Sequence, residues 1–131
     1  MNKVHEFVID GKLPSLNSYT QANRYNKYAG SKMKANNQSY IRGCIYQQLE
    51  RKTIQKPVIV HCTWVEDNRK RDLDNIRFAV KFILDALVEC KILENDSCRY
   101  VKGFTDDFKY EDKAKVIVQL EEVEEGDTNE Y

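Results

Sequence analysis

The run from Arg69 to Asn75 places three basic residues directly before two aspartates, Asp72 and Asp74, that lie two positions apart. Carboxylates at this spacing, on a turn that leaves a strand, can converge on one hard cation. Mg²⁺ takes one or two protein carboxylates and completes its octahedron with waters and phosphate oxygens. Basic residues beside such acids are expected where a phosphodiester supplies the remaining ligands. The run therefore predicts a magnesium site that acts on a phosphate-containing substrate.

A simpler interpretation of the same run is local. Asp74 or Asn75 would cap the helix that follows, and Asp72 would stabilise the turn. A cap needs one such residue, however, and three of them stand within four positions.

Two further groups could extend the site. Along the next helix, Asp74, Arg77, Lys81, Asp85 and Glu89 are spaced three or four residues apart, so they form one polar stripe on an otherwise apolar helix. The alternative is a solvated stripe with a weak Lys81–Asp85 pair. Asp96 precedes the third strand and would supply a third carboxylate if that strand pairs beside the second; the alternative is a plain turn.

The spacing of the acids, cysteines and histidines does not favour an EF-hand or a zinc site. The EF-hand template fails because Ile76 and Arg77 occupy its fifth and sixth positions. The four cysteines, 44, 62, 90 and 98, include no C-x-x-C pair and no histidine at zinc spacing. With no export signal, they are expected to be reduced thiols in a cytoplasmic protein.

The elements that must position these residues follow from hydrophobic periodicity. The chain of 131 residues predicts a single domain, 1–131, of the α+β class: a mixed sheet with two main helices in the order β-α-β-α-β-β. Strand 58–65 is apolar on both faces, which favours a central strand covered on each side. The other expected segments are strand 4–9, a long basic loop 12–37, helix 37–52, helix 75–90, strands 97–105 and 113–123 joined by loop 106–112, and an acidic tail 121–131.

The order of these motifs resembles a known family. Arg71-Asp72-Leu73-Asp74-Asn75, then Asp85-Ala86-Leu87, then Asn95-Asp96 is similar to the RusA family of Holliday-junction resolvases of bacteria and their prophages. Leu13-Pro14-Ser15-Leu16-Asn17-Ser18-Tyr19 is similar to a segment near the start of those proteins. The resemblance covers about residues 7–120. It implies a homodimeric nuclease that cuts four-way DNA junctions in recombination and repair.

Carried over by position, the resemblance makes Asp72, Asp74 and Asp96 the magnesium ligands, with Mn²⁺ able to substitute. The helix between Asp74 and Asp85 is three residues longer than in the best-known members, which moves the expected catalytic lysine. Lys81 is our choice because three residues is nearly one helical turn, and Arg77 is the competing candidate. The acid pair before Ser97 has become Asn95-Asp96, so one carboxylate remains there.

Expected DNA contacts come from basic residues near the motif and in the long loop. Phosphate contacts are predicted from Arg69, Lys70, Arg71 and Arg77, and from the loop residues Arg24, Lys27, Lys32 and Lys34, which are interleaved with Tyr19, Tyr25 and Tyr28. Loop tyrosines that merely pack on the domain are the alternative.

The formal net charge of zero does not argue against such a partner. Residues 1–56 hold ten basic and three acidic side chains, whereas residues 78–131 hold seven basic and fourteen acidic ones. The charge is thus separated along the chain. No apolar run is long enough to cross a membrane. Two rival functions remain: a non-catalytic branched-DNA-binding prophage remnant, and a magnesium phosphoesterase acting on flaps or forks.

Overall fold

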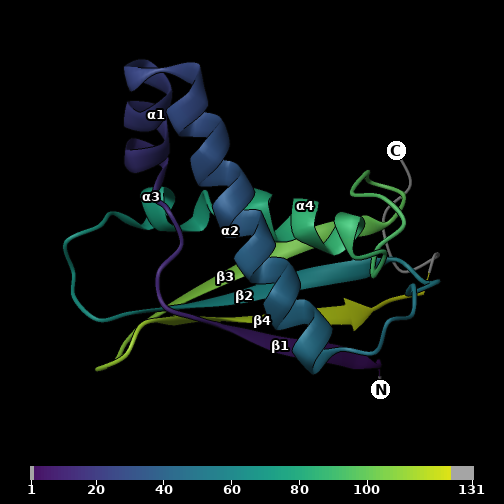
Figure 1. Cartoon of the computed structure of the whole chain (residues 1–131). Helices are drawn as coiled ribbons and strands as arrows, with labels where there is room; N and C mark the ends of the chain where they lie inside the picture. Colours follow the sequence, from purple (N-terminus) through teal and green to yellow (C-terminus); the bar gives the residue numbers. More distant parts are fainter. Residues whose placement is uncertain (1, 125–131) are drawn as a thin grey trace.

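Four strands form one mixed sheet in the order β1-β4-β2-β3, and helices cover one of its faces (Figure 1). The computed structural model describes residues 2–124. The elements in chain order are β1 (Val4–Asp10), α1 (Leu16–Tyr25), α2 (Lys27–Gln48), β2 (Val58–Glu66), α3 (Leu73–Arg77), α4 (Val80–Glu89), β3 (Val101–Tyr110) and β4 (Lys115–Glu122). The predicted α+β class is confirmed, and the predicted order holds roughly: α2 covers most of the expected helix 37–52 but begins ten residues earlier, α1 is an additional helix, and the expected helix 75–90 is two helices.

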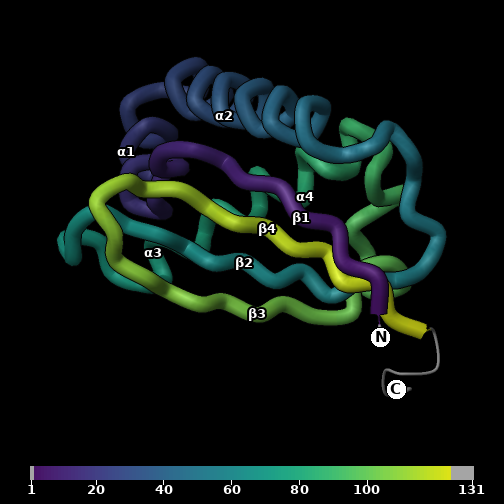
Figure 2. The backbone as a smooth tube through the Cα atoms, turned by 90° about the horizontal axis from the view of Figure 1, so that it is seen from below, coloured from purple at the N-terminus to yellow at the C-terminus, as the bar shows by residue number. Residues whose placement is uncertain are grey.

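The pairing of β2 and β3 decides where the functional residues go. These two strands are parallel, while β4 is antiparallel to both β1 and β2 (Figure 2). Parallel neighbours need a crossover, which α3 and α4 supply. As a result the C-terminal ends of β2 and β3 lie side by side, and the residues before β3 lie at the opposite end of these two strands.

The core lies between the helices and one face of the sheet. On β2, Val58, Val60, Cys62 and Trp64 all point to this face and are at most 2% exposed. The expectation that β2 is covered on both sides is wrong, because the helices lie on one side only (Figure 1). On the other face His61 is partly exposed, and its ring hydrogen-bonds Thr105 and Glu121.

Segment 12–37 is not a loop but contains α1 and the first part of α2. Helix α1 starts with a capping box, in which Ser15 and Ser18 bond each other's backbone N–H groups. Asn26 ends α1 and caps α2, its side chain accepting from the Ala29 N–H at 2.7 Å. Hydrophobic periodicity did not indicate this helical hairpin because the segment is mostly polar and has few apolar residues. Its folding depends on caps and on contacts with the rest of the domain.

Three other boundaries differ from expectation. The expected helix 75–90 is divided at residues 78–79 into α3 and α4, and β3 continues through Tyr110, where loop 106–112 was expected. Glu121 and Glu122, expected in the tail, belong to β4. The rest of the tail from residue 125 lies outside the described residues. No helix within residues 2–124 combines the length and apolar character needed to span a membrane.

Candidate functional site

The turn after β2 is held by a buried ion pair. Glu66, the last residue of β2, has a side chain that is 5% exposed, and both of its oxygens accept bonds from Arg71, at 2.9 and 2.7 Å. A bidentate pair of this kind fixes both distance and orientation. Arg71 was expected to contact DNA, but its guanidinium is engaged here, which gives it a positioning role.

The N-terminal segment packs against this turn. Arg71 also donates to the Leu13 carbonyl at 2.8 Å, and the Asn17 N–H donates to Asn75 Oδ1 at 3.3 Å. Lys12 pairs with Asp67 at 2.6 Å, and this hydrogen bond lowers the pKa of the Asp67 carboxyl. Two of the four segments that carry the family resemblance, 13–19 and 71–75, are therefore in contact, although 58 positions separate Asn17 from Asn75.

Asp72 and Asp74 are presented to solvent at the start of α3. Asp72 occupies the N-cap position in extended conformation, yet its side chain makes no capping bond. Among residues 2–124 neither carboxylate has a hydrogen-bond or ion-pair partner. The simpler capping interpretation therefore does not account for the two acids, whose oxygens are available to a cation.

The two candidate cations that follow this turn in the chain differ in their surroundings. Arg77 donates to Asp106 at 2.8 Å, and the other oxygen of Asp106 accepts from the Trp64 indole at 2.8 Å. Arg77 thus ties α3 to β3. Lys81 is exposed and has no ion-pair partner in the described part of the chain. Asp106 was missed because its segment was expected to be a loop, where strand pairing could not place it.

The polar stripe expected along a single helix 75–90 is divided between α3 and α4, and its residues face different parts of the fold. Asp85 accepts from Gln38 at 3.1 Å and lies 3.7 Å from the Lys34 ammonium, while Glu89 pairs with Arg42 at 2.6 Å. These acids face α2, whereas Arg77 faces β3. The break between α3 and α4 at residues 78–79 separates Arg77 from the acids that face α2.

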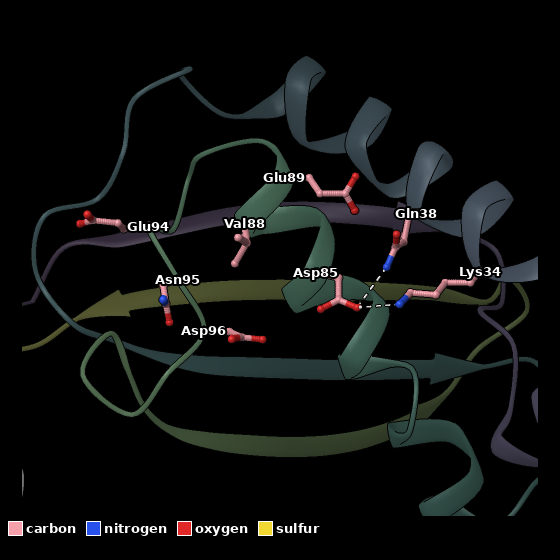
Figure 3. A pocket seen from close by; sticks show the side chains of 8 residues that line it. All are labelled: Lys34, Gln38, Asp85, Val88, Glu89, Glu94, Asn95 and Asp96. Carbon is pink, nitrogen blue, oxygen red and sulfur yellow. Dashed lines mark hydrogen bonds and ion pairs between the residues drawn. The ribbon is translucent and has the colours of Figure 1, made fainter. Parts of the chain in front are cut away.

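Asp96 lies in a different place from Asp72 and Asp74. It lines a polar pocket of about 410 Å³ at the C-terminal half of α4, together with Glu94 and Asn95 from its own loop (Figure 3). The other lining residues come from α2 and α4: Lys34, Gln38, Asp85, Val88 and Glu89. Gln38 is buried and donates to Asp85, so this wall of the pocket is ordered by α2–α4 contacts.

The three aspartates are not brought together within one chain. The third strand does pair beside the second, as the prediction required, but the pairing is parallel. Asp96 precedes β3 by five residues and Asp72 follows β2 by six. The two aspartates therefore lie at opposite ends of this parallel pair of strands. Within residues 2–124 no three side chains of His, Cys, Asp or Glu are grouped so that they could hold a metal ion.

The remaining basic candidates lie on two surfaces. Arg69 stacks over the Tyr110 ring at 3.8 Å, and Lys70 is exposed beside it. Arg24, Lys27 and Lys32 are exposed where α1 meets α2. Lys34 lies one turn further along α2, where it faces Asp85 rather than open solvent.

Cys62 on β2 is buried and lies opposite Asp106 of the neighbouring strand β3. Burial, and to a smaller extent the negative charge of Asp106, raise the pKa of the Cys62 thiol to about 12. At neutral pH this thiol is therefore protonated and a poor nucleophile.

Comparisons with known proteins assign no family: no protein-family model matches the chain, and no curated protein sequence matches it either. What the fold and site define by themselves is an α+β domain with two exposed aspartates on a braced turn, flanked by basic side chains.

Proposed function

We propose that this chain is a magnesium-dependent endonuclease of branched DNA, which resolves four-way junctions in recombination and repair. The observation that carries the proposal is the turn at Asp72 and Asp74. Two unpartnered carboxylates stand beside exposed Lys70 and Arg69, on a turn that a buried ion pair and the N-terminal segment hold in place. The resemblance to RusA resolvases supplies the substrate class.

The donor set suits Mg²⁺, which takes one or two protein carboxylates when phosphate oxygens complete its shell. Asp72 and Asp74 would hold it, with Mn²⁺ as a substitute. When bound, the metal activates water and stabilises the charge on the phosphate. Lys81 places a positive charge beside the phosphate as electrostatic stabiliser or proton donor. The free ammonium of Lys81 favours it over Arg77, whose guanidinium is already paired with Asp106.

Asp96 enters this scheme through a homodimer. β1 is a protected edge, because Gln48 bonds both backbone groups of Val8 at 2.8 Å and Tyr40 donates to the Asp10 carbonyl. β3 is the other edge strand, and no side chain of the described residues bonds its backbone. Open edges pair with other strands. Antiparallel pairing of two β3 edges about a two-fold axis would bring Asp96 of the partner subunit toward Asp72 and Asp74.

The test is nicking of a synthetic mobile four-way junction in Mg²⁺ or Mn²⁺. Wild type should nick it, while Asp72→Asn and Asp96→Asn should each be inactive. Mixing the two inactive variants should restore activity, because a mixed dimer contains one intact shared site. A site made within one chain would stay inactive in every mixture. Equal behaviour of wild type and Asp72→Asn would refute the catalytic proposal.

A second candidate is a non-catalytic protein that binds branched DNA. The separation of Asp96 from the other two aspartates in one chain favours it. Calorimetric titration with Mg²⁺ separates the two candidates, since the non-catalytic protein should show no heat that depends on Asp72. Junction binding in Ca²⁺ without any nicking in Mg²⁺ would establish this second function.

A further inference from the structure

The tip of the α1–α2 hairpin carries two highly exposed tyrosines. Tyr25 is 82% exposed and Tyr28 is 73% exposed, more than any other large hydrophobic side chain in the described residues. A tyrosine on a folded domain usually buries much of its ring. Two such rings, three residues apart, give the tip an unusual aromatic surface.

The tip is rigid rather than a loop that could fold back. Asn26 alone connects the two helices and caps both of them. Tyr19 packs its ring against Phe78 and Phe82 at centroid distances of 5.6 and 5.5 Å, which anchors α1 on the domain. Figure 1 shows α1 and the start of α2 standing away from the sheet. The open rings are therefore held outward by the fold.

The charge around the rings is of one sign. No acidic residue occurs between Asp10 and Glu50, a stretch that holds six basic ones. Arg24, Lys27 and Lys32 surround the two tyrosines, and none of them has an ion-pair partner within residues 2–124. The Lys32 ammonium lies 5.9 Å from the centre of the Tyr28 ring. A ligand for this surface must bring negative charge together with flat, stackable groups.

We propose that this tip binds unpaired DNA bases beside the branch point, with Tyr25 and Tyr28 as stacking platforms. Single strands are bound in this way by aromatic rings with a basic groove along the backbone. Arg24, Lys27 and Lys32 neutralise the adjoining phosphates. The binding of unpaired bases stands on the tip alone, while their place beside the branch point rests on the proposed nuclease function.

The position of the tip sets the length of strand involved. Helix α1 begins beside Asn75 and rises about 1.5 Å per residue, so Tyr25 lies about 14 Å from its start. At the rise of one strand in duplex DNA, about 3.4 Å per nucleotide, this distance corresponds to about four nucleotides, and to fewer if the strand is extended. Unpaired bases about four nucleotides from the cut phosphate should therefore reach the tip.

The experiment measures binding of the full chain to a fluorescent dT20 strand and to a 20-base-pair duplex, in EDTA so that nothing is cut. Tyr25→Ala and Tyr28→Ala should each weaken dT20 binding about fivefold or more, because stacking contributes about 1–3 kcal/mol per base. The double variant should leave duplex binding within threefold. Tyr25→Phe with Tyr28→Phe keeps the ring faces and should bind dT20 like wild type.

Tyr46→Ala is the matched control. Tyr46 is also exposed and on α2, but its ring lies under the Arg51 guanidinium at 4.3 Å, at the opposite end of the helix. This variant should not change dT20 binding. Because Tyr25 and Tyr28 are so exposed, the melting temperature of their variants should equal that of wild type, which shows that folding is not the cause of a loss.

Three results would overturn the inference: unchanged dT20 binding in the double alanine variant, equal loss for dT20 and duplex, or capture of the protein on phosphatidylserine vesicles that the same substitutions abolish. Failure of the nuclease proposal is seen separately. If Asp72→Asn nicks junctions like wild type while the tyrosine variants lose dT20, only the catalytic proposal fails. Asp72-dependent nicking with dT20 binding unchanged in the tyrosine variants contradicts only the tip.

Discussion

At the scale of single residues, Arg71 bonds both oxygens of Glu66 and the Leu13 carbonyl, so one guanidinium joins β2 to the N-terminal segment. Replacing it in Arg71→Met leaves a buried carboxylate without a partner. We expect the free energy of unfolding to fall by about 3 kcal/mol, as is typical when one side of a buried pair is removed. Urea unfolding measures this loss.

Lys70→Met is the control for this prediction. It removes a neighbouring charge from an exposed side chain and should change the free energy of unfolding by less than about 0.5 kcal/mol. If both variants lose the same stability, the Glu66–Arg71 pair does not brace the turn.

The four thiols should differ in reactivity for the same local reasons. Cys98 is exposed, whereas Cys44, Cys62 and Cys90 are buried, and the pKa of Cys62 is raised to about 12. At pH 8 a thiolate attacks a disulfide reagent, forms a mixed disulfide with one of its sulfurs and releases the other as a thiolate. One thiol per chain should therefore react rapidly in the folded protein and four in urea. In Cys98→Ser the rapid phase should disappear; its persistence would mean that a buried thiol is accessible.

At the scale of elements, α1 depends on Tyr19, whose ring packs with Phe78 and Phe82. Tyr19→Ala should cost about 2 kcal/mol of unfolding free energy, because Tyr19 is partly buried and loses two aromatic contacts. Hydrogen exchange should show faster exchange in α1 and little change in β2. Tyr25→Ala, on the exposed side of the same helix, is the control. Equal protection of α1 in both variants would contradict this anchoring.

The strands could be predicted from sequence where β-branched and apolar residues cluster in a short run, as in β1 and β2, or alternate with polar ones, as in β4. The hairpin α1–α2 could not, because its N-terminal part has few apolar residues and its stability comes from caps and from Tyr19 against a helix over fifty positions away. The C-terminal part of β3, residues 106–110, likewise could not be predicted from the sequence. Asp106 and Asp107 disfavour a strand locally, yet Asp106 is satisfied by Trp64 and Arg77 once the sheet forms.

At the scale of the whole molecule, the sequence placed Asp72 and Asp74 on one turn and the N-terminal motif could be matched to it by resemblance. The position of Asp96 could not be predicted, because a sequence does not state whether neighbouring strands run parallel. The parallel pairing of β2 and β3 puts Asp96 at the opposite end of these strands from Asp72 and Asp74. The proposed three-aspartate site would therefore be shared between two subunits, which the mixing of Asp72→Asn and Asp96→Asn tests.

The zero net charge of the chain predicts weak salt dependence only if positive and negative groups are mixed on its surface. In the fold some cations are paired with acids and others are not. Arg24, Lys27, Lys32, Arg69 and Lys70 have no acidic partner among residues 2–124, whereas Arg42 pairs with Glu89. If these five cations contact duplex phosphates, the logarithm of the binding constant should fall with the logarithm of salt at a slope of about −4 to −5.

Single alanine substitutions test that slope. Lys27→Ala and Lys70→Ala should each reduce it by about one, on any DNA sequence, because each removes one phosphate contact. Arg42→Ala should leave the slope unchanged, since its guanidinium is already neutralised by Glu89 at 2.6 Å. Binding measured between 50 and 200 mM salt in Ca²⁺ gives the answer. A wild-type slope near zero would show that these five cations do not contact duplex phosphates.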